Sequence, residues 1–259
     1  MALSNSILGT WYRDLLIEGS MNLTRGEKSV VSLKKVIECK EVICIIPTLN
    51  EVTTITEVIE KSKDFAKRII VVDGRSEDGT AKLAWDAGAE VIIQEGEGKG
   101  MALRTVFEII DGDIFVIIDG DATYNPLEMR EILRPIIEGK ADIVIGSRLA
   151  GKMETGSMSN MNRFGNQLFN LLINTFFKGD ITDSQSGFRA LNRQAVESLK
   201  LSSEGFEIET EITIKALKQG LRVKEVPITY AKRRGSPSKL SSLKVGSRIL
   251  KTIIEHIGD

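Results

Sequence analysis

The sequence predicts a mixed α/β fold in which helices flank a mostly parallel sheet. From residue 41 onward, short apolar runs alternate with longer segments whose apolar residues recur at helical spacing. The run Ile114–Ile118 is wholly apolar, which is typical of a central parallel strand covered on both faces. Gly88, Gly139 and Gly220 follow helical segments and mark where helices are expected to end. Repeated strand and helix units of this kind build a parallel sheet.

Most predicted strands are short runs rich in valine and isoleucine. They lie at residues 42–46, 69–72, 91–93, 114–118, 143–145, 187–191 and 221–230. The predicted helices are identified by apolar residues three or four positions apart and by their caps. Asp78 precedes one helix, and Asn125 with Pro126 opens another. The helices lie at 52–65, 78–87, 101–110, 125–139, 162–177, 206–219 and 241–257.

The periodicity divides the chain into three parts. Residues 1–40 lack a strong period and are interpreted as an N-terminal extension, 41–240 form the α/β domain, and 241–259 form a C-terminal amphipathic helix. The polar, glycine-containing stretch 151–162 predicts a mobile loop, and a subdomain boundary is expected just after Arg148.

Composition and charge exclude several classes of protein. The chain has 259 residues, 42% of them hydrophobic, with 35 basic and 36 acidic side chains. This composition is that of a globular protein able to bury a core. The balanced charge gives no basic field over the whole domain, so nucleic acid is not expected as a partner. The sequence leaves the oligomeric state open.

The rare residue types narrow the chemistry. The single histidine, His256, excludes histidine-based triads and histidine-ligated zinc. Any metal ion is therefore expected to be held by carboxylates, which favours Mg2+ or Mn2+. Cys39 and Cys44 form no CxxC pair, and a reducing compartment is expected.

Targeting and membrane patterns favour a cytoplasmic location. The longest uncharged run, Phe164–Phe177, is too short and too polar for a spanning helix, which needs about 18 or more apolar residues. The amino terminus lacks the pattern of a secretory signal. The protein is expected to stay in the compartment where it is made.

Polar residues follow three predicted strands, at the edge where parallel sheets bind ligands. In VIIDGDATYNP, Asp119 and Asp121 are two positions apart, so both carboxylates can face one ion. Asp73 ends the strand in VVDGRSEDGT and is a further candidate ligand. An isolated Asp-Gly-Asp is more often a solvated turn, and only its combination with the other segments favours a binding site.

Glycines surround one lysine in the segment EGEGKGMA. Gly96, Gly98 and Gly100 could bring the backbone and the ammonium of Lys99 close to a phosphate at a helix start. The segment lacks the spacing of a P-loop, and a flexible turn is the alternative interpretation.

Seven segments occur in the order found in family 2 glycosyltransferases. They are IIPTLNE, VVDGRSEDGT, GKG, DGD, GSR at 146–148, SQSGFRA and GFEIETE. Together with the late EVPITYAKRRGSPSKL, they make the chain resemble the dolichyl-phosphate mannose synthases and polyprenyl-phosphate glycosyltransferases of that family. The resemblance covers about Glu41 to Leu240. It implies a Rossmann-like GT-A fold in which a nucleoside diphosphate sugar meets dolichyl or polyprenyl phosphate at a membrane surface.

The resemblance also implies roles for individual residues. The donor nucleotide would be held by Pro47, Asn50, Glu51 and Asp73, with Lys99 nearby. The metal ion, Mg2+ or Mn2+, would be held by Asp119 and Asp121. The residues that would face donor or acceptor phosphates are Arg148, Arg163, Arg189, Arg233, Ser238 and Lys239. The catalytic residues would be Asp121, Arg148, Arg189, Arg233 and Lys239. Arginine suits phosphate because its planar fork can bind two oxygens. Arg163 has an alternative interpretation, as an exposed charge at the start of a helix with no role in binding phosphate.

Two departures from the family pattern leave the donor and the metal ligands open. Gly74 stands where relatives commonly carry a second acidic residue, so the base of the donor nucleotide is not fixed. Thr123 stands where relatives often carry a glutamine ligand, so the third metal ligand is open.

Other functions remain as alternatives. A related enzyme could glycosylate a saccharide or phosphoglycerate hydroxyl, with Glu207 or Glu209 as the base. Two further alternatives are a protein that binds nucleotide sugars or transfers nucleotidyl groups, and a nonenzymatic membrane adaptor. Neither of these functions accounts as well for the segments SQSGFRA and RRGSPSKL.

Two amphipathic segments predict membrane-surface helices. Residues 231–259 carry seven basic and two acidic side chains, and the last helix has an apolar stripe with cationic flanks, as expected for a helix on an anionic bilayer. The apolar run within 168–177 is a second candidate contact. Packing on the protein's own core, or for 168–177 in a dimer, is the alternative. The expected location is therefore peripheral, on the cytoplasmic face of a membrane.

Overall fold

The computed structural model describes residues 40–235 and 242–258. Contacts divide the chain into two compact units, Met1–Lys40 and Glu41–Asp259. The expected N-terminal extension lies outside the described residues except for Lys40, and so do Ser238 and Lys239.

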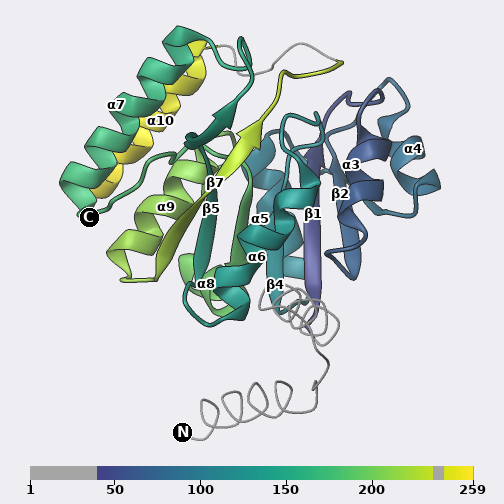
Figure 1. The fold of residues 1–259 in the computed structure, drawn as a ribbon, viewed down its shortest axis with the longest axis horizontal. Coiled ribbons are helices and arrows are strands. Elements are labelled where there is room, and N and C mark those ends of the chain that lie inside the picture. The colour runs from purple at the N-terminus through teal and green to yellow at the C-terminus, as the bar shows by residue number, and fades with distance from the viewer. Residues whose placement is uncertain (1–39, 236–241, 259) are drawn as a thin grey trace, which may run out of the picture. The chain divides into compact units, whose positions relative to one another are not determined.

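A seven-stranded, mostly parallel sheet organises the second unit (Figure 1). The strands are β1 (Val42–Thr48), β2 (Arg68–Asp73), β3 (Glu90–Ile93), β4 (Ile114–Ile117), β5 (Ile143–Met153), β6 (Arg189–Asn192) and β7 (Val223–Tyr230). Their order is β3-β2-β1-β4-β6-β5-β7, and only β6 runs antiparallel to its neighbours β4 and β5. The mostly parallel α/β sheet expected from the sequence is confirmed.

Helices cover both faces of the sheet. They are α3 (Ile55–Ser62), α4 (Thr80–Asp86), α5 (Lys99–Ile109), the 3-10 turn η1 (Pro126–Glu128), α6 (Met129–Ile137), α7 (Asn160–Phe177), α8 (Arg193–Leu199), α9 (Ile208–Lys218) and α10 (Ser242–Gly258). Successive strand residues point to opposite faces. Ile43 and Ile45 therefore join one core with Ile212 of α9, whereas Ile46 lies beside Ile55 of α3 on the other face.

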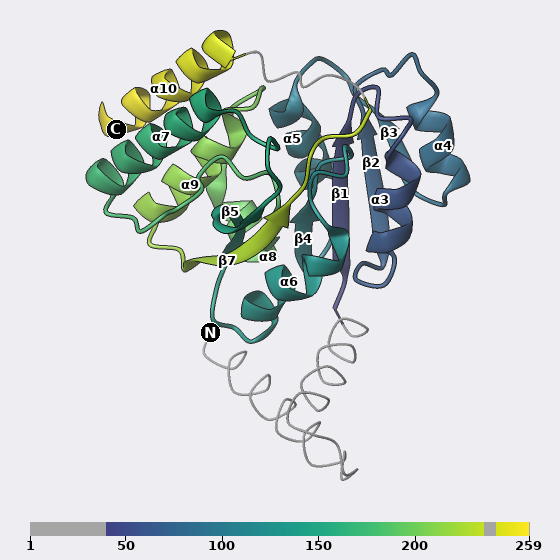
Figure 2. The same ribbon diagram turned by 45° about the horizontal axis from the view of Figure 1, so that its top comes forward.

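A second, smaller core joins three helices at one end of the sheet. Ile173 of α7, Ile214 of α9, and Ile249 and Ile253 of α10 are buried together. Figures 1 and 2 both show α7 and α10 side by side at the end opposite α3 and α4. Among residues 40–235 and 242–258, no helix is both long enough and apolar enough to cross a bilayer.

One strand and one helix differ from the expectation. The strand expected at 143–145 continues to Met153 because Lys152 and Met153 pair with β7. Gly151 lies at this pairing, where a Cβ would come within 1.9 Å of the Ile228 carbonyl oxygen. The expected loop at 151–162 is therefore shorter and spans 154–159. The boundary after Arg148 is wrong, since 41–259 form one unit. The short helix α8 was not predicted.

Candidate active site

Acidic side chains from three strand ends meet at one edge of the sheet. Strands β1, β2 and β4 are parallel neighbours, so their carboxyl ends share an edge. Asp73 ends β2, Glu51 follows β1, and Asp119 and Asp121 follow β4. All except Asp119 are buried. The structure thus brings together the acidic residues that the sequence singles out.

Asp73 holds the turn that follows β2. Its carboxylate accepts hydrogen bonds from the Ser76 amide (2.8 Å), the Ser76 hydroxyl (2.6 Å) and the Thr48 hydroxyl (3.3 Å). The next residue, Gly74, lies so close to β1 that a Cβ would be 3.3 Å from the Thr48 carbonyl oxygen. Asp73 therefore supports the expected donor edge mainly by ordering its backbone.

Asn50 joins the loops that follow β1 and β2. It has a left-handed backbone (φ 55°), a conformation that asparagine tolerates well. Its side-chain oxygen accepts from the Glu77 amide at 3.0 Å, and its own amide donates to Ser76 Oγ at 2.8 Å. Pro47 lies within β1, opposite Val72. The two hydrogen bonds of Asn50 fix the position of the next residue, Glu51.

Asp119 and Asp121 lie on either side of Gly120 and have different partners. The Thr123 amide (3.0 Å) and hydroxyl (2.6 Å) donate to Asp121 Oδ1. Burial and the negative charge of Asp119 raise the pKa of Asp121 above its usual value, despite these bonds and the nearby Arg233. Two neighbouring acidic groups, one of them buried, create a site that favours a cation. Thr123, at the position where relatives often carry a glutamine ligand, thus orients the carboxylate of Asp121.

Lys99 lies between two carboxylates. Its ammonium is 2.5 Å from Asp119 Oδ1 and 2.6 Å from Glu209 Oε1. Burial lowers the pKa of Lys99, but the charges of Asp119 and Glu209 outweigh it, so the pKa lies above its usual value and the side chain stays protonated. Gly187 leaves room for this contact, since a Cβ there would be 2.6 Å from the Lys99 ammonium. Sequence reasoning did not pair Glu209 with Lys99, because 110 positions separate them.

The glycines around Lys99 serve packing. A Cβ on Gly98 would lie 2.4 Å from the Glu204 carbonyl oxygen, and one on Gly100 would lie 2.3 Å from that of Ser203. The Met101 amide donates to the Glu204 carbonyl at 3.0 Å. The start of α5 is thus pressed against the turn before α9, which aims Lys99 at Asp119.

Arg233 reaches the acidic edge from the segment after β7. Its Nη1 contacts Asp121 Oδ2 and its Nη2 contacts Glu51 Oε1. The neighbouring backbone is anchored, since the Ala231 amide donates to the Thr123 carbonyl at 2.8 Å. Arg233, which was expected to face phosphates, therefore lies at the carboxylates.

Arg148 is bound to a buried partner. Its guanidinium makes two bonds of 2.7 Å with the Asp183 carboxylate and lies over the Tyr230 ring, 5.2 Å from the centroid. The expectation that Arg148 faces a phosphate finds no support in these contacts. A bidentate pair of this kind instead ties β5 to the segment before β6.

Arg189 organises the SQSGFRA segment from inside. It is 0% exposed and donates to the carbonyls of Ser184 (2.5 Å), Ser186 (2.7 Å) and Glu209 (2.9 Å). These contacts likewise give no support to a phosphate-facing role. Arg163 is exposed on the first turn of α7 and is not part of the carboxylate site.

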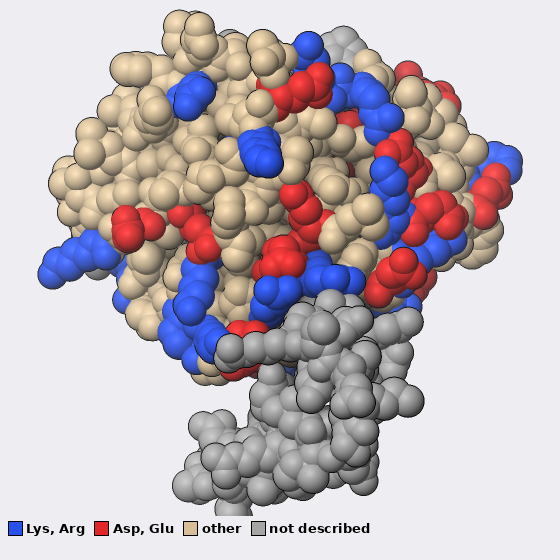
Figure 3. Space-filling view, viewed as in Figure 1, with Lys and Arg blue, Asp and Glu red and all other residues tan. Residues whose placement is uncertain are grey.

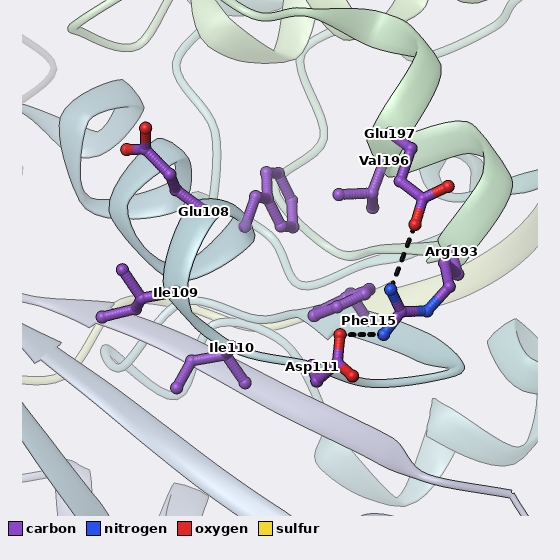
Figure 4. Close-up of a pocket in the computed structure, with 9 residues that line it drawn as sticks. Glu108, Ile109, Ile110, Asp111, Phe115, Arg193, Val196 and Glu197 are labelled. Carbon is purple, nitrogen blue, oxygen red and sulfur yellow. Dashed lines mark hydrogen bonds and ion pairs between the residues drawn. The ribbon is translucent and has the colours of Figure 1, made fainter.

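A surface hollow lies apart from this site, around the C-terminal end of α5. It measures about 310 Å³ and includes Phe115, Val196 and Arg193 in its lining. Figure 4 shows Arg193 between Asp111 and Glu197, pairing with both. None of the residues expected to bind substrate lies in it.

A mostly parallel α/β sheet with charged side chains at its carboxyl edge is typical of enzymes that bind nucleotides there. A model of glycosyl transferase family 2 matches residues 43–200. Glycosyltransferase AglJ of Haloferax volcanii is 40% identical over 214 residues, covering 81% of this chain and 70% of AglJ. The dolichyl-phosphate hexose transferase of the same organism is 31% identical over 214 residues, covering 82% and 91%. The chain belongs to glycosyl transferase family 2 and is a glycosyltransferase.

A solved structure supports the fold. Glucosyl-3-phosphoglycerate synthase from Mycobacterium tuberculosis, in complex with Mn2+, UDP-glucose and phosphoglyceric acid, matches with a TM-score of 0.72 at 24% identity. The match covers 92% of this chain and 85% of that one. The expected GT-A fold is confirmed.

Proposed function

We propose that the protein transfers a hexose or N-acetylhexosamine from a nucleoside diphosphate sugar, GDP-mannose or a UDP-sugar, to dolichyl or another polyprenyl phosphate, with inversion at the anomeric carbon. The observation that carries this is the contact of Arg233 with Glu51 and Asp121, because it brings a cation suited to phosphate to the acidic edge. A phosphate acceptor held by Arg233 would meet the donor there. The similarity to a dolichyl-phosphate hexose transferase supports the same class of acceptor.

The proposed reaction needs no base from the protein. A phosphate oxygen of the acceptor forms a bond to C1 of the sugar while the bond from C1 to the donor's β-phosphate oxygen breaks. The nucleoside diphosphate leaves with the electron pair. Because the acceptor phosphate is already ionised at neutral pH, the protein has to align the two reactants and stabilise charge on the leaving group.

Asp119 and Asp121 fit Mg2+ or Mn2+. Both offer hard carboxylate oxygens, and burial together with the charge of Asp119 raises the pKa of Asp121. Within the described part of the chain, no group of three or more acidic, histidine or cysteine side chains is arranged to hold a metal. Diphosphate and water oxygens would complete the coordination, which is usual for Mg2+ with nucleotides. A bound ion would neutralise the leaving diphosphate.

A lipid acceptor requires contact with a membrane, and the outer face of α7 and α10 is suited to it. Exposed apolar side chains line both helices: Met161, Phe164, Leu168 and Leu171 on α7, and Leu250, Ile254 and Ile257 on α10. Exposed Lys244, Arg248 and Lys251 lie among those of α10. In Figure 3 the surface over α7 carries few charges. These features support peripheral binding to an anionic, cytoplasmic membrane surface.

A hydroxyl acceptor is the second candidate, favoured by one observation. Glu209 is buried beside Lys99, and its Oε2 atom accepts no hydrogen bond from residues 40–235 or 242–258. A carboxylate in this position could accept a proton from a saccharide or phosphoglycerate hydroxyl. This reaction would also place the donor at Asp119 and Asp121.

A comparison of two acceptors distinguishes the two candidate functions. The full chain would be incubated with Mn2+ and radiolabelled GDP-mannose, UDP-glucose or UDP-N-acetylglucosamine. Each donor would be offered dolichyl phosphate or 3-phosphoglycerate. Label extracted into butanol with dolichyl phosphate is the expected result. Label that enters only a water-soluble product would contradict the proposal.

A further inference from the structure

We propose that Asn170 and Asn174 of α7 are positioning residues of the active site. They hold the backbone of residues 181–184, and this segment sets the position of the groups that border Lys99 and Asp119. The inference rests on the chain being a glycosyltransferase and does not depend on which acceptor it uses.

Two asparagines one turn apart on α7 bind the backbone of one following segment. The Asn174 side chain donates to the Ile181 carbonyl oxygen and accepts from the Ile181 amide, both at 2.9 Å. The Asn170 side chain donates to the Thr182 carbonyl oxygen at 2.5 Å and accepts from the amide (2.9 Å) and the hydroxyl (2.7 Å) of Ser184. Asn170 is 6% exposed, and a buried backbone group that loses its partner is costly. The path of this segment therefore depends on α7.

The position of Ser184 affects a buried arginine and, through it, a charged pair of the site. The Ser184 carbonyl oxygen accepts from Arg189 Nη2 at 2.5 Å, and Arg189 Nη1 donates to the Glu209 carbonyl oxygen at 2.9 Å. The Glu209 carboxylate contacts the Lys99 ammonium at 2.6 Å. A shift of Ser184 would therefore change how Glu209 holds Lys99.

The backbone that follows Ser184 also lies directly against the site. A Cβ on Gly187 would be 2.6 Å from the Lys99 ammonium and 2.7 Å from Asp119 Oδ2. With so little space, a small displacement of this backbone would move the two charged groups. Asn170 and Asn174 act on these groups through the backbone between them, so they are positioning residues and not catalytic ones.

The first measurement is amide hydrogen exchange of the full chain, read by mass spectrometry of peptides within 181–187. Asn170→Ala removes the acceptor of the Ser184 amide, and Asn174→Ala removes that of the Ile181 amide. Each variant should exchange about fivefold faster in these peptides, whereas peptides from β1 and β4 should be unchanged.

Gln167→Ala is the matched control, because Gln167 is an exposed amide side chain on the same helix. It should leave exchange in every peptide unchanged. Faster exchange throughout the sheet would indicate a merely structural role and would overturn the proposal, as would unchanged exchange within 181–187. The measurement contains no donor or acceptor, so a failure of the proposed function would not affect it.

The second measurement is kcat for sugar transfer to the acceptor that the unaltered chain uses, dolichyl phosphate or 3-phosphoglycerate. Asn170→Ala should lower kcat about tenfold when assayed well below its unfolding temperature, which circular dichroism gives. Asn174 is only partly buried, so Asn174→Ala keeps the test possible if Asn170→Ala does not fold. An unchanged kcat in a folded variant whose 181–187 segment exchanges faster would overturn the proposal.

A double-mutant cycle separates positioning through Ser184 from general destabilisation. Ser184→Ala removes the hydroxyl that donates to Asn170. If Asn170 acts through Ser184, the double variant should lose clearly less activity than the product of the two single losses, because the second change removes an interaction already broken. Losses that multiply would contradict action through Ser184.

Discussion

At the scale of single residues, each of two cations at the active-site edge lies between two carboxylates. Lys99 pairs with Asp119 and Glu209, and Arg233 pairs with Asp121 and Glu51. Removing one member of such a set leaves the other charge without compensation, which costs far more than the pair contributes. Substitutions that keep the shape of the side chain are therefore the clearest tests.

Asp121→Asn should reduce sugar transfer by about 100-fold or more, since it removes a negative charge that would hold the ion. EDTA should abolish transfer by the unaltered enzyme, and added Mn2+ should restore it. Initial rates measure both effects. Asp86→Asn is the control, because Asp86 is an exposed residue paired with Lys82. Full activity of Asp121→Asn, or of the enzyme in EDTA, would refute a metal-dependent site.

Glu209→Gln should reduce transfer to lipid phosphate by less than about 100-fold, because Glu209 positions Lys99 and removes no proton. The pH–rate profile should keep its limbs. Loss of a general base costs about 100-fold to 10,000-fold and removes one limb. If Glu209→Gln gave that signature, the hydroxyl acceptor would become the better interpretation.

At the scale of elements, α7 and α10 each have two functions. Their inner faces contribute Ile173, Ile249 and Ile253 to the small core, and their outer faces expose apolar side chains. Asn170 and Asn174 of α7 also bind the backbone of the following segment, with the Asn170 side chain 2.5 Å from the Thr182 carbonyl oxygen. Helix α7, one of the two helices expected on a membrane, is thus bonded directly to the segment that carries Asp183.

The double change Leu250→Glu and Ile254→Glu should abolish sedimentation with anionic vesicles without unfolding the protein, since both side chains are exposed. Deleting α10 is a poorer test because it would open the small core. Ile109→Glu is the control, as an exposed apolar residue at the end of α5. Binding of the double variant equal to that of the control would exclude α10 as the membrane contact.

At the scale of the whole molecule, the sequence predicted the sheet well because its strands are continuous apolar runs. The partners of buried charges could not be predicted in this way. Arg148 and Asp183 are 35 positions apart, and nothing local distinguishes a paired arginine from one that binds phosphate. The continuation of β5 was missed because the residues after Ile145 form no continuous apolar run and owe their extended form to β7. Local pattern predicts elements, whereas contacts between distant segments decide which charges are available.

The pH dependence of stability also belongs to the whole molecule. Burial raises the pKa of Glu211, but hydrogen bonds from Lys215, Ser203 and Ser202 outweigh it and lower the pKa to about 2 from the usual 4.5. The folded state therefore favours the carboxylate. The stability that Glu211 contributes is fully present above the pKa of this residue in the unfolded chain. It is lost as the pH falls toward the lower pKa of the folded state.

The free energy of unfolding should accordingly fall between about pH 4.5 and pH 2, and the fall should be shallower in Glu211→Gln. Urea denaturation at a series of pH values measures it. Glu131→Gln, an exposed carboxylate on α6, should behave as the unaltered chain. Parallel curves for the Glu211 variant and the unaltered chain would contradict this role.

The close approach of Gly98 and Gly100 to Ser203 and Glu204 has a consequence for exchanging parts between relatives. The two segments are about a hundred positions apart, yet the backbone of the second leaves no space for a side chain at either glycine. A chimaera that takes its glycine-rich loop from a relative will succeed only if the turn before α9 is taken from the same parent. Natural variation in the two segments should be linked for the same reason.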